Sequence, residues 1–404
     1  MNELVPDDWK VSTLGDCCSV LDSQRIPLNS QDRAKRKGVY PYYGANGVQG
    51  YIDDYIFEGD AILLAEDGGY FDEYAHRPIA NFVTGRFWVN NHAHILRSKN
   101  ETQNKWIYYC LVHKNITKHI NGGTRSKLNQ SDLKEIQIPV PPVPEQQKIA
   151  AILTSVDEVI EKSQAQIDKL QDLKKATMNQ LLTRGINHTE FKDSPLGKIP
   201  KDWEVKKLGE LSRNGINNGV FCDPKKIGRG YRLINVVNMY KGFSIKPDTL
   251  KLLDVDEKEF SKNKVEKGDV FFTRSSLKLE GIAYCNINLS ESDDLTYDGH
   301  IMKVSPNSEI INAEFLANYC LSNFARTYFM RAAKHSTMTT IGQQDIFPLP
   351  VAVPPMNEQF LIVEIIKSIS TNIEQKQRKL EQTKALKKSL MQDLLTGKKR
   401  VKVG

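Results

Sequence analysis

A few residues of this 404-residue chain have the types or spacing that catalysis or metal binding requires. Ser275 and Lys278 form an SxxK spacing, but no SDN or KTG accompanies them, so a nucleophilic serine is not expected. His92 and His94 have no cysteine or acidic partner at zinc spacing, which favours buried or hydrogen-bonded histidines. The acidic residues around the glycines at 68–69 resemble a turn more than a magnesium site, because the corresponding place later in the chain is basic.

Motifs of nucleotide and cofactor chemistry are missing from the sequence. There is no GxxxxGK[ST] phosphate loop, and no FxGxG with the (D/N/S)PP(Y/F/W) motif of an amino-methyltransferase. The glycine-rich run from Tyr40 to Tyr51 lacks the βαβ surroundings of a dinucleotide fingerprint. We therefore expect no catalytic residues, no bound metal and no cofactor, and a protein that binds its target without transforming it.

Two long segments of the chain are copies of one another. EQQKIAAILTSVDEVIEKSQAQIDKLQDLKKATMNQLLT begins at Glu145, and EQFLIVEIIKSISTNIEQKQRKLEQTKALKKSLMQDLLT begins at Glu358 and aligns with it without a gap. Much of the segment 6–15 also recurs, at 200–209. A period this long indicates domain duplication. A duplicated chain without a duplicated catalytic set suits a two-fold target, of which duplex DNA is the commonest.

Composition limits the partners and the compartment. The net charge of +7 permits nucleic acid as a partner without requiring it. The six cysteines show no CxxC and no disulfide-like spacing, which is typical of reduced thiols. The first residues lack an apolar leader, and no stretch reaches about 18 apolar residues. We expect a cytoplasmic protein without a membrane span.

The copied segments predict two long helices. Apolar residues recur at steps of three and four, prolines precede each segment, and glycines at 185 and 397 follow. A helix of about 39 residues with one narrow apolar stripe requires a partner helix, and the other copy is the nearest. Two separate helical hairpins or linkers are the alternative. The predicted pairing residues are Ile149, Ile152, Val156, Ile160 and Leu173 in the first helix, and Ile362, Ile365, Ile369, Ile373 and Leu386 in the second.

The regions before the helices predict globular domains. Short runs such as AILLA, HAHIL, VFFTR and HIMKV are typical of half-buried strands. WIYYCLVHKNI and AEFLANYCLSNFARTYFMRAA predict helices late in each region, although the apolar and β-branched residues of the first leave it ambiguous. The expected fold class is α+β: two pseudo-symmetric mixed α/β globular domains separated by two long antiparallel helices that form a coiled coil.

Several loops of these regions suit contacts with phosphates and base edges, because most place basic side chains beside hydroxyl and amide groups and the first mixes aromatic and amide side chains with glycines. They are YPYYGANGVQGY, NGGTRSKLNQ and its counterpart KHSTMTTIGQQ, TRSSLKLEG and YRLINVVNMYKG. A plain hairpin, a solvated loop or strand-end charges are the alternatives. The candidate DNA-binding residues are Tyr42, Tyr43, Asn46, Gln49, Thr124, Arg125, Ser126, Lys127, Arg232, Asn235, Arg274, Ser275, Ser276, Lys278, Ser336, Thr337 and Thr339.

The order of these segments resembles one family. A variable region, a P-x-x-EQ-x-x-I helix that ends in LKKxxMxxLLT, the segment IPKDWEVKKLGE, a second variable region and a second helix follow one another. Together they resemble the specificity subunit of bacterial type I restriction–modification systems. The resemblance covers essentially the whole chain, and no single motif would establish it alone.

The resemblance implies a role for each segment. Each variable region would be a target recognition domain that reads half of a split, asymmetric site in double-stranded DNA. The helices would set the spacer and dock two methyltransferase subunits, which the translocating restriction subunits join. Catalysis would belong to those partners. The implied boundaries are 1–144 for recognition domain 1, 145–183 for helix 1, 184–357 for recognition domain 2, 358–396 for helix 2 and 397–404 for a basic tail.

Two other functions compete with this one. A methyltransferase or nuclease acting alone would bind S-adenosylmethionine or carry catalytic motifs, and the missing motifs argue against it. A coiled-coil scaffold that binds only proteins would show no salt-dependent affinity for duplex DNA.

Overall fold

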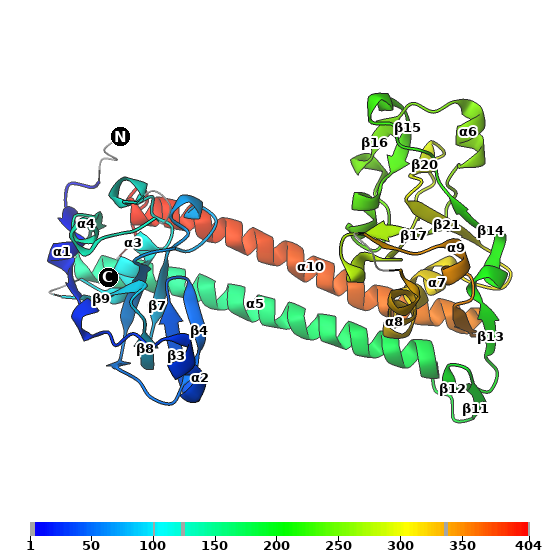
Figure 1. Cartoon of the computed structure of the whole chain (residues 1–404). Coiled ribbons are helices and arrows are strands. Elements are labelled where there is room, and N and C mark those ends of the chain that lie inside the picture. The colour runs from blue at the N-terminus through cyan, green and yellow to red at the C-terminus, as the bar shows by residue number, and fades with distance from the viewer. Residues whose placement is uncertain (1–4, 100–101, 123–125, 335–337, 403–404) are drawn as a thin grey trace. The chain divides into compact units, whose positions relative to one another are not determined.

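The computed structural model describes residues 5–99, 102–122, 126–334 and 338–402 (Figure 1). The chain divides into two compact units, and each contains part of both long helices. Unit 1 consists of residues 1–165 and 378–404, and unit 2 consists of residues 166–377. Within the described residues, no helix is both long and apolar enough to cross a membrane.

The two long helices are α5 (Val143–Arg184) and α10 (Met356–Leu395), and each begins two residues before its copied segment. Pro144 fits the first turn of α5, because a backbone N–H there would have no acceptor within the helix. Gly185 and Gly397 follow the last turns with φ angles of 65° and 73°. This left-handed conformation favours glycine and ends the helix.

The helices pack together in an antiparallel manner, as the sequence predicts. In unit 1, Ile149 and Leu153 from the start of α5 share a core with Leu394 from the end of α10. In unit 2, Leu182 from the end of α5 shares a core with Ile362 from the start of α10. Each end of the helix pair is therefore also part of the core of a globular unit.

The side chains proposed for the pairing stripe differ in burial. Ile149, Ile362 and Ile373 are buried, whereas Ile152, Val156, Ile160 and Ile369 are half-buried. Three predictions need correction, because the side chains are exposed: Ile365 by 38%, Leu173 by 51% and Leu386 by 55%. At about 100° per residue, Leu173 and Leu386 lie roughly 120° around the helix from Ile149 and Ile362. Other buried positions continue the stripe, namely Leu153, Ile167, Ile366, Leu380, Met391 and Leu394.

The globular part of unit 1 contains two four-stranded sheets. In the first, the order is β2 (Cys18–Val20), β9 (Ala93–Ser98), β6 (Ala61–Ala65) and β7 (Ala80–Val83). In the second, it is β4 (Gly47–Ile52), β3 (Lys37–Gly44), β8 (Arg86–Val89) and β5 (Phe57–Glu58). A separate ladder joins β1 (Lys10–Thr13) to β10 (Gln137–Val140). The short helices are α1 (Leu14–Cys17), α2 (Ser30–Lys35), α3 (Asn104–Leu111) and α4 (Gln130–Lys134).

Unit 2 repeats this plan. One sheet has the order β14 (Ser212–Asn218), β21 (Ile301–Pro306), β17 (Val270–Thr273) and β19 (Cys285–Ile287). The other has the order β16 (Lys251–Leu253), β15 (Ile227–Ile234) and β20 (Leu295–Tyr297). The remaining strands are β11 (Phe191–Ser194), β12 (Gly197–Pro200), β13 (Glu204–Lys207), β18 (Ser275–Ser276), β22 (Thr339–Thr340) and β23 (Pro350–Val353), and the helices are α6 (Glu257–Lys262), α7 (Ala313–Cys320), α8 (Asn323–Ala332) and α9 (Gln343–Ile346).

The same connections recur in both units. The ladder β13–β23 corresponds to β1–β10, and the parallel pair β15–β20 corresponds to β3–β8. The helix prediction for AEFLANYCLSNFARTYFMRAA is confirmed by α7 and α8, and that for WIYYCLVHKNI is confirmed for its first six residues, which lie in α3. The mixed α/β fold class with paired long helices is therefore confirmed.

The repeated Glu-Gln pair at the start of each long helix attaches the helix to its globular domain. In unit 1, the indole Nε1–H of Trp9 donates to Glu145 at 3.1 Å, and Gln146 accepts from the Gln103 backbone N–H at 3.0 Å. In unit 2, the corresponding bonds run from Trp203 to Glu358 at 2.9 Å and from the Asn312 N–H to Gln359 at 2.7 Å. All four Glu and Gln side chains are buried, so the repeated motif is explained by this attachment.

Candidate nucleic-acid interface

Backbone hydrogen bonds hold three segments side by side in unit 2, where the two inner strands of the main sheet, β17 and β21, end and begin. The Arg274 N–H donates to the His300 carbonyl at 2.8 Å, and the Ile341 N–H donates to the Arg274 carbonyl at 3.0 Å. Ser275 then pairs with Thr340 in the ribbon of β18 and β22. These bonds bring together the loop TRSSLKLEG and the loop KHSTMTTIGQQ, which the sequence suggested separately.

Unit 1 contains the same three segments with the same bonds. The Glu66 N–H donates to the His92 carbonyl at 2.8 Å, and the Leu128 N–H donates to the Glu66 carbonyl at 2.7 Å. Asp67 forms a β-bridge with Lys127. We name this arrangement the loop frame, which consists of residues 66–67, 92 and 127–128 in unit 1 and of residues 274–275, 300 and 340–341 in unit 2.

A short hairpin completes each loop frame. Asn121 and Lys127 exchange two backbone hydrogen bonds of 2.7 Å, and Lys334 and Thr340 exchange two of 2.8 and 3.0 Å. The two loops matched in the sequence therefore match in structure as well. The candidate residues Thr124, Arg125, Ser336 and Thr337 lie outside the described residues.

The side chains on the two loop frames differ in charge. In unit 1, Glu66 pairs with Arg25 at 2.7 Å and with Lys127 at 3.4 Å. In unit 2, Arg274 replaces Glu66 and is exposed, and Ser275 replaces Asp67. One backbone arrangement therefore presents carboxylates paired with basic side chains in unit 1 and a basic, hydroxyl-bearing surface in unit 2.

The predicted residues of the glycine-rich loop in unit 1 do not share one environment. Tyr42 is buried among Ile52 and Trp88, so the prediction that it contacts DNA is wrong. Side chains along β3 alternate between the two faces of the sheet, and Tyr42 faces inward, where its ring completes a small core. Tyr43 is half-buried, and burial raises the pKa of its hydroxyl. Asn46 and Gln49 are exposed, and Asn46 donates to the Gly68 carbonyl beside the loop frame at 3.0 Å.

Lys127 lies on the loop frame of unit 1, and Ser126 directly precedes it. Lys127 is exposed, and its ammonium group is paired with Glu66. Ser126 is half-buried, and its carbonyl accepts from the Gly68 N–H at 3.3 Å. The structure therefore brings these two residues close to the glycine turn at 68–69 and to Asn46.

In unit 2, the predicted residues on and beside the loop frame differ in exposure from one another. Arg274 and Lys278 are exposed, and Ser275 and Ser276 are half-buried, whereas Thr339 is 7% exposed. On β15, Arg232 forms an ion pair with Asp294 at 2.8 Å. Asn235 precedes a 3-10 turn, and its N–H donates to Asn238. The burial of Thr339, the ion pair of Arg232 and the hydrogen bond of Asn235 therefore give these three residues structural roles.

Two exposed apolar side chains near the loop frame of unit 2 were not predicted. Leu277 is 85% exposed between Ser276 and Lys278, and Phe221 is 82% exposed. Phe221 follows Val220, which forms a β-bridge with Asp298 beside His300. Sequence patterns assign apolar residues to the core, so neither residue gave a signal.

His300 did give a signal in the sequence. Both NNHAHIL and DGHIMKV place a polar residue two positions before a histidine that precedes a strand.

A buried network anchors the loop frame of unit 1. His94 is 1% exposed and contacts Asp22 through Nδ1 at 2.6 Å and the Leu128 carbonyl through Nε2 at 2.8 Å. Burial alone would raise the pKa of the Asp22 carboxyl, but hydrogen bonds from His94 and Ile95 and the charges of His94 and Arg25 hold that pKa below its ordinary value. The network therefore connects the centre of the sheet to residue 128.

Replacing Asp22 by asparagine should destabilise unit 1 at neutral pH by about 2 kcal/mol, because a charged hydrogen bond is lost. A lowered folded-state pKa stabilises the protein above the ordinary value of 3.8, and this stabilisation disappears as the pH falls below it. The difference in unfolding free energy between wild type and Asp22→Asn should therefore shrink below about pH 4. Urea denaturation at pH 7, 5 and 3.5 measures it, and a difference independent of pH would contradict the assignment.

Among the described residues, two groups of histidine and carboxylate atoms are close enough together to bind a metal ion, namely Asp22, Glu66 and His94, and His188, Asp202 and Glu358. In the first, a carbonyl and a carboxylate oxygen occupy the two nitrogens of His94, which leaves no lone pair for a metal. In the second, Glu358 accepts from the Ile186 N–H at 2.8 Å and from Trp203 at 2.9 Å, and it contacts His188 at 2.8 Å. Internal hydrogen bonds thus satisfy both groups.

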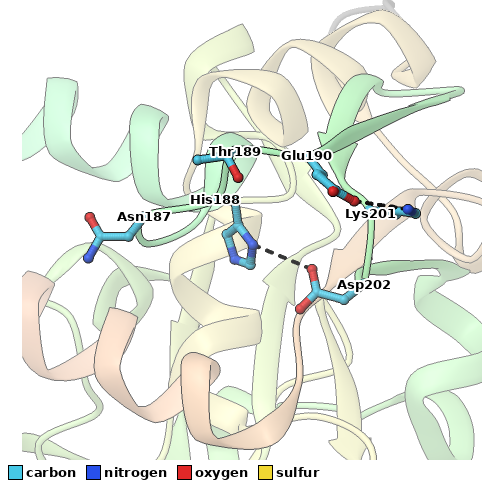
Figure 2. A pocket seen from close by; sticks show the side chains of 6 residues that line it. All are labelled: Asn187, His188, Thr189, Glu190, Lys201 and Asp202. Carbon is cyan, nitrogen blue, oxygen red and sulfur yellow. Dashed lines mark hydrogen bonds and ion pairs between the residues drawn. The ribbon is translucent and has the colours of Figure 1, made fainter.

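An open pocket of about 340 Å³ includes two residues of the second group and is lined by Asn187, His188, Thr189, Glu190, Lys201 and Asp202, whose side chains are drawn in Figure 2. Its charges pair with one another: Lys201 contacts Glu190 at 2.9 Å, and His188 contacts Asp202 at 3.5 Å. This pocket lies at the attachment of α10, and we assign it no ligand.

A family model and two curated relatives all match type I restriction specificity proteins. A family model described as the type I restriction modification DNA specificity domain matches residues 6–172 and 200–385. The putative type I restriction enzyme MjaX specificity subunit of Methanocaldococcus jannaschii is 30% identical, with 98% of this chain and 95% of the relative covered. The MjaVIII specificity subunit of the same organism is 26% identical, with 98% and 94% covered.

Solved structures share the fold. The S subunit of a type I restriction–modification system from M. genitalium superposes with a TM-score of 0.61 at 15% identity, with 98% of this chain and 97% of that chain covered. A chain from a structural study of type I R-M complex assembly and conformational transition gives a TM-score of 0.55 at 14% identity, with 97% and 98% covered. At these identities, the likeness concerns the fold alone.

Proposed function

This chain belongs to the family of type I restriction–modification DNA specificity subunits, and we propose that each of its two units reads one half of a split, asymmetric site in double-stranded DNA. A specificity subunit recognises DNA and has no catalysis of its own. The recognition domains proposed here are residues 1–144 and 184–357, joined by the helical segments 145–183 and 358–396, with a basic tail at 397–404. A cytoplasmic location remains a prediction.

The observation that supports this proposal best is the loop frame. The same backbone hydrogen bonds recur in both units, but Glu66 and Asp67 of unit 1 are replaced by Arg274 and Ser275 in unit 2. Base pairs are distinguished by the donors and acceptors that side chains present to their edges. Two similar frames with different side chains are therefore suited to two different short sequences.

We further propose that α5 and α10 determine the distance between the two half-sites and bind methyltransferase subunits, two per chain, which restriction subunits join. Exposed apolar residues on the helices support a protein partner there. Phe360, Leu361 and Ile365 near the start of α10 are between 38% and 56% exposed. Exposed apolar clusters of this kind typically mark protein contacts.

Mapping DNA methylation tests the function directly. The chain would be co-expressed with its cognate methyltransferase subunit in a host without other methylation, and modified bases would be located across the genome by single-molecule sequencing. We expect one motif of two short defined blocks separated by an unspecified spacer of fixed length. The matched control is the methyltransferase subunit expressed alone.

Other outcomes would decide against the proposal. A stable complex that methylates one uninterrupted motif would contradict a split site. A stable complex without methylation and without salt-dependent affinity for duplex DNA would favour the protein-binding scaffold instead.

A further inference from the structure

The two most exposed large apolar side chains among the described residues both border the loop frame of unit 2. Leu277 is 85% exposed, and Phe221 is 82% exposed. Apolar side chains that are scattered singly over a surface require no explanation. Two beside one frame do require one, because each leaves most of its apolar area in water, which is unfavourable unless a partner covers it.

The main sheet of unit 2 brings the segments of these two residues to one end. β21 lies between β14 and β17 and runs antiparallel to both. The ends of β14 and β17 and the start of β21 therefore lie together. Phe221 follows the end of β14 by three residues, and Leu277 follows the end of β17 by four. Both apolar side chains thus belong to loops that leave the sheet beside the loop frame.

Backbone hydrogen bonds continue this arrangement beyond the strands. The Gly299 N–H donates to the Val220 carbonyl at 2.7 Å, and the Arg274 N–H donates to the His300 carbonyl at 2.8 Å. Residues 298–300 therefore lie between the segment that leads to the exposed phenylalanine and the segment that leads to the exposed leucine. The two apolar side chains belong to segments that flank the frame on opposite sides.

The surface around the exposed leucine is cationic. Arg274 and Lys278 are exposed, and within the described part of the chain neither forms an ion pair with an acidic side chain. Unpaired cations beside hydroxyl groups favour an anionic partner such as DNA. A surface for binding another protein would be expected to form a contiguous apolar patch instead. The charge of this surface therefore favours a DNA duplex as the partner that covers the apolar side chains.

Unit 1 presents a different surface at the corresponding place. Asp67 and Ser275 occupy the same frame position, and two residues further along the chain stand Gly69 in unit 1 and Leu277 in unit 2. Glycine has no side chain to offer. An apolar contact from this position is therefore available to unit 2 alone, and it would contribute to a difference between the two half-sites.

One group on the edge of a DNA base is apolar. Thymine has a methyl group at C5, which faces the major groove and which the other three bases lack. Apolar side chains, phenylalanine among them, recognise thymine by contact with this methyl group. The polar edges of the other bases would lose hydrogen bonds to water at the same place. An exposed apolar side chain on a cationic surface is therefore suited to select thymine.

We propose that Phe221 and Leu277 contact thymine methyl groups in the half-site that unit 2 reads. The inference rests on the proposed function, since it assumes that the loop frame of unit 2 faces DNA. It requires this half-site to contain A·T pairs whose thymine methyl groups are needed for full affinity.

The test compares thymine with uracil, which pairs with adenine in the same way and lacks only the methyl group. The complex of the chain with its methyltransferase subunits is assayed for binding to the cognate duplex and to duplexes in which one thymine of the mapped motif is replaced by uracil. Replacement of a contacted thymine should weaken binding about fourfold. Uracil in the unspecified spacer is the control, and that duplex should bind like the cognate one.

Variants connect this effect to the two side chains. Phe221→Ala and Leu277→Ala should each bind the cognate duplex about fourfold more weakly, and each should lose the effect of uracil at one position, because the same contact is removed in both ways. Leu277→Met retains an apolar side chain of similar volume and should restore the effect of uracil. Val11→Ala removes a 52% exposed side chain from β1 in unit 1, outside the loop frame, and should behave like wild type. Thermal unfolding of each complex checks that the fold is intact.

A wild-type affinity that no uracil replacement within the motif alters would overturn the inference, and so would uracil effects that persist undiminished in both alanine variants. Folded alanine variants that release the methyltransferase subunits would assign these side chains to a protein contact and would overturn it as well. A wild-type complex that fails to distinguish the cognate duplex from one with an altered base pair would instead contradict the proposed function. The two failures are therefore distinguishable.

Discussion

Substituting Trp203 by alanine should leave unit 2 largely unfolded. The indole ring is fully buried in the main core of this unit, and its Nε1–H donates to the buried Glu358 carboxylate. Removing such a side chain costs about 3–5 kcal/mol, and leaving a buried acceptor without its donor costs about 1–3 kcal/mol more. Since folded domains are stable by about 5–15 kcal/mol, the sum approaches the whole stability of the unit.

Limited proteolysis under native conditions measures this effect, because cleavage should become rapid at sites within 166–377. Trp203→Phe is the matched control, since it retains most of the ring volume and loses only the hydrogen bond to Glu358. It should cost about 1–3 kcal/mol in urea denaturation. A Trp203→Ala chain as resistant to protease as wild type would show that the attachment of α10 contributes little to stability.

Replacing Arg274 and Lys278 together by alanine should change one half of the methylated motif and leave the other half intact. Both side chains are exposed beside the loop frame of unit 2, while the frame bonds of Arg274 belong to its backbone and survive the substitution. A single base-reading contact contributes about 1–3 kcal/mol of discrimination, which corresponds to roughly 10- to 100-fold. Methylation mapping should therefore show a relaxed position in one block only.

The control for this pair removes the same charge elsewhere in unit 2. Lys258 and Lys262 are exposed on α6, outside the loop frame, so Lys258→Ala with Lys262→Ala should leave both blocks unchanged. If the double variant at Arg274 and Lys278 relaxed both blocks equally, these residues would contribute to general affinity for DNA rather than to the specificity of one half-site.

The long helices and the plan of each domain were accessible from the sequence because their signals are local. Apolar residues at steps of three and four predict α5 and α10, and proline and glycine mark their ends within a few residues. The exposed Leu173 and Leu386 show the limit of this approach, because a step of 24 residues accumulates a rotation that a list of apolar positions does not reveal. Burial of Tyr42 was hidden for a similar reason, since β3 alternates between inward and outward positions.

The loop frame could not be predicted, because it consists of backbone hydrogen bonds between distant segments. Arg274 meets His300 and Ile341, yet no residue type is required for these contacts. Sequence chemistry therefore located TRSSLKLEG and NGGTRSKLNQ as candidate loops without placing them beside the histidines at 92 and 300. The backbone hydrogen bonds of the folded chain bring these segments together.

The loop frame also bears on how such a protein can change over evolutionary time. Its hydrogen bonds join main-chain N–H and carbonyl groups, which remain the same whatever side chain a position bears. The replacement of Glu66 by Arg274 between the two copies is a reversal of charge on an unchanged scaffold. The fold therefore tolerates substitutions at these positions, while the surface that the side chains form can change. Randomised libraries at these positions should yield mostly folded variants for directed evolution.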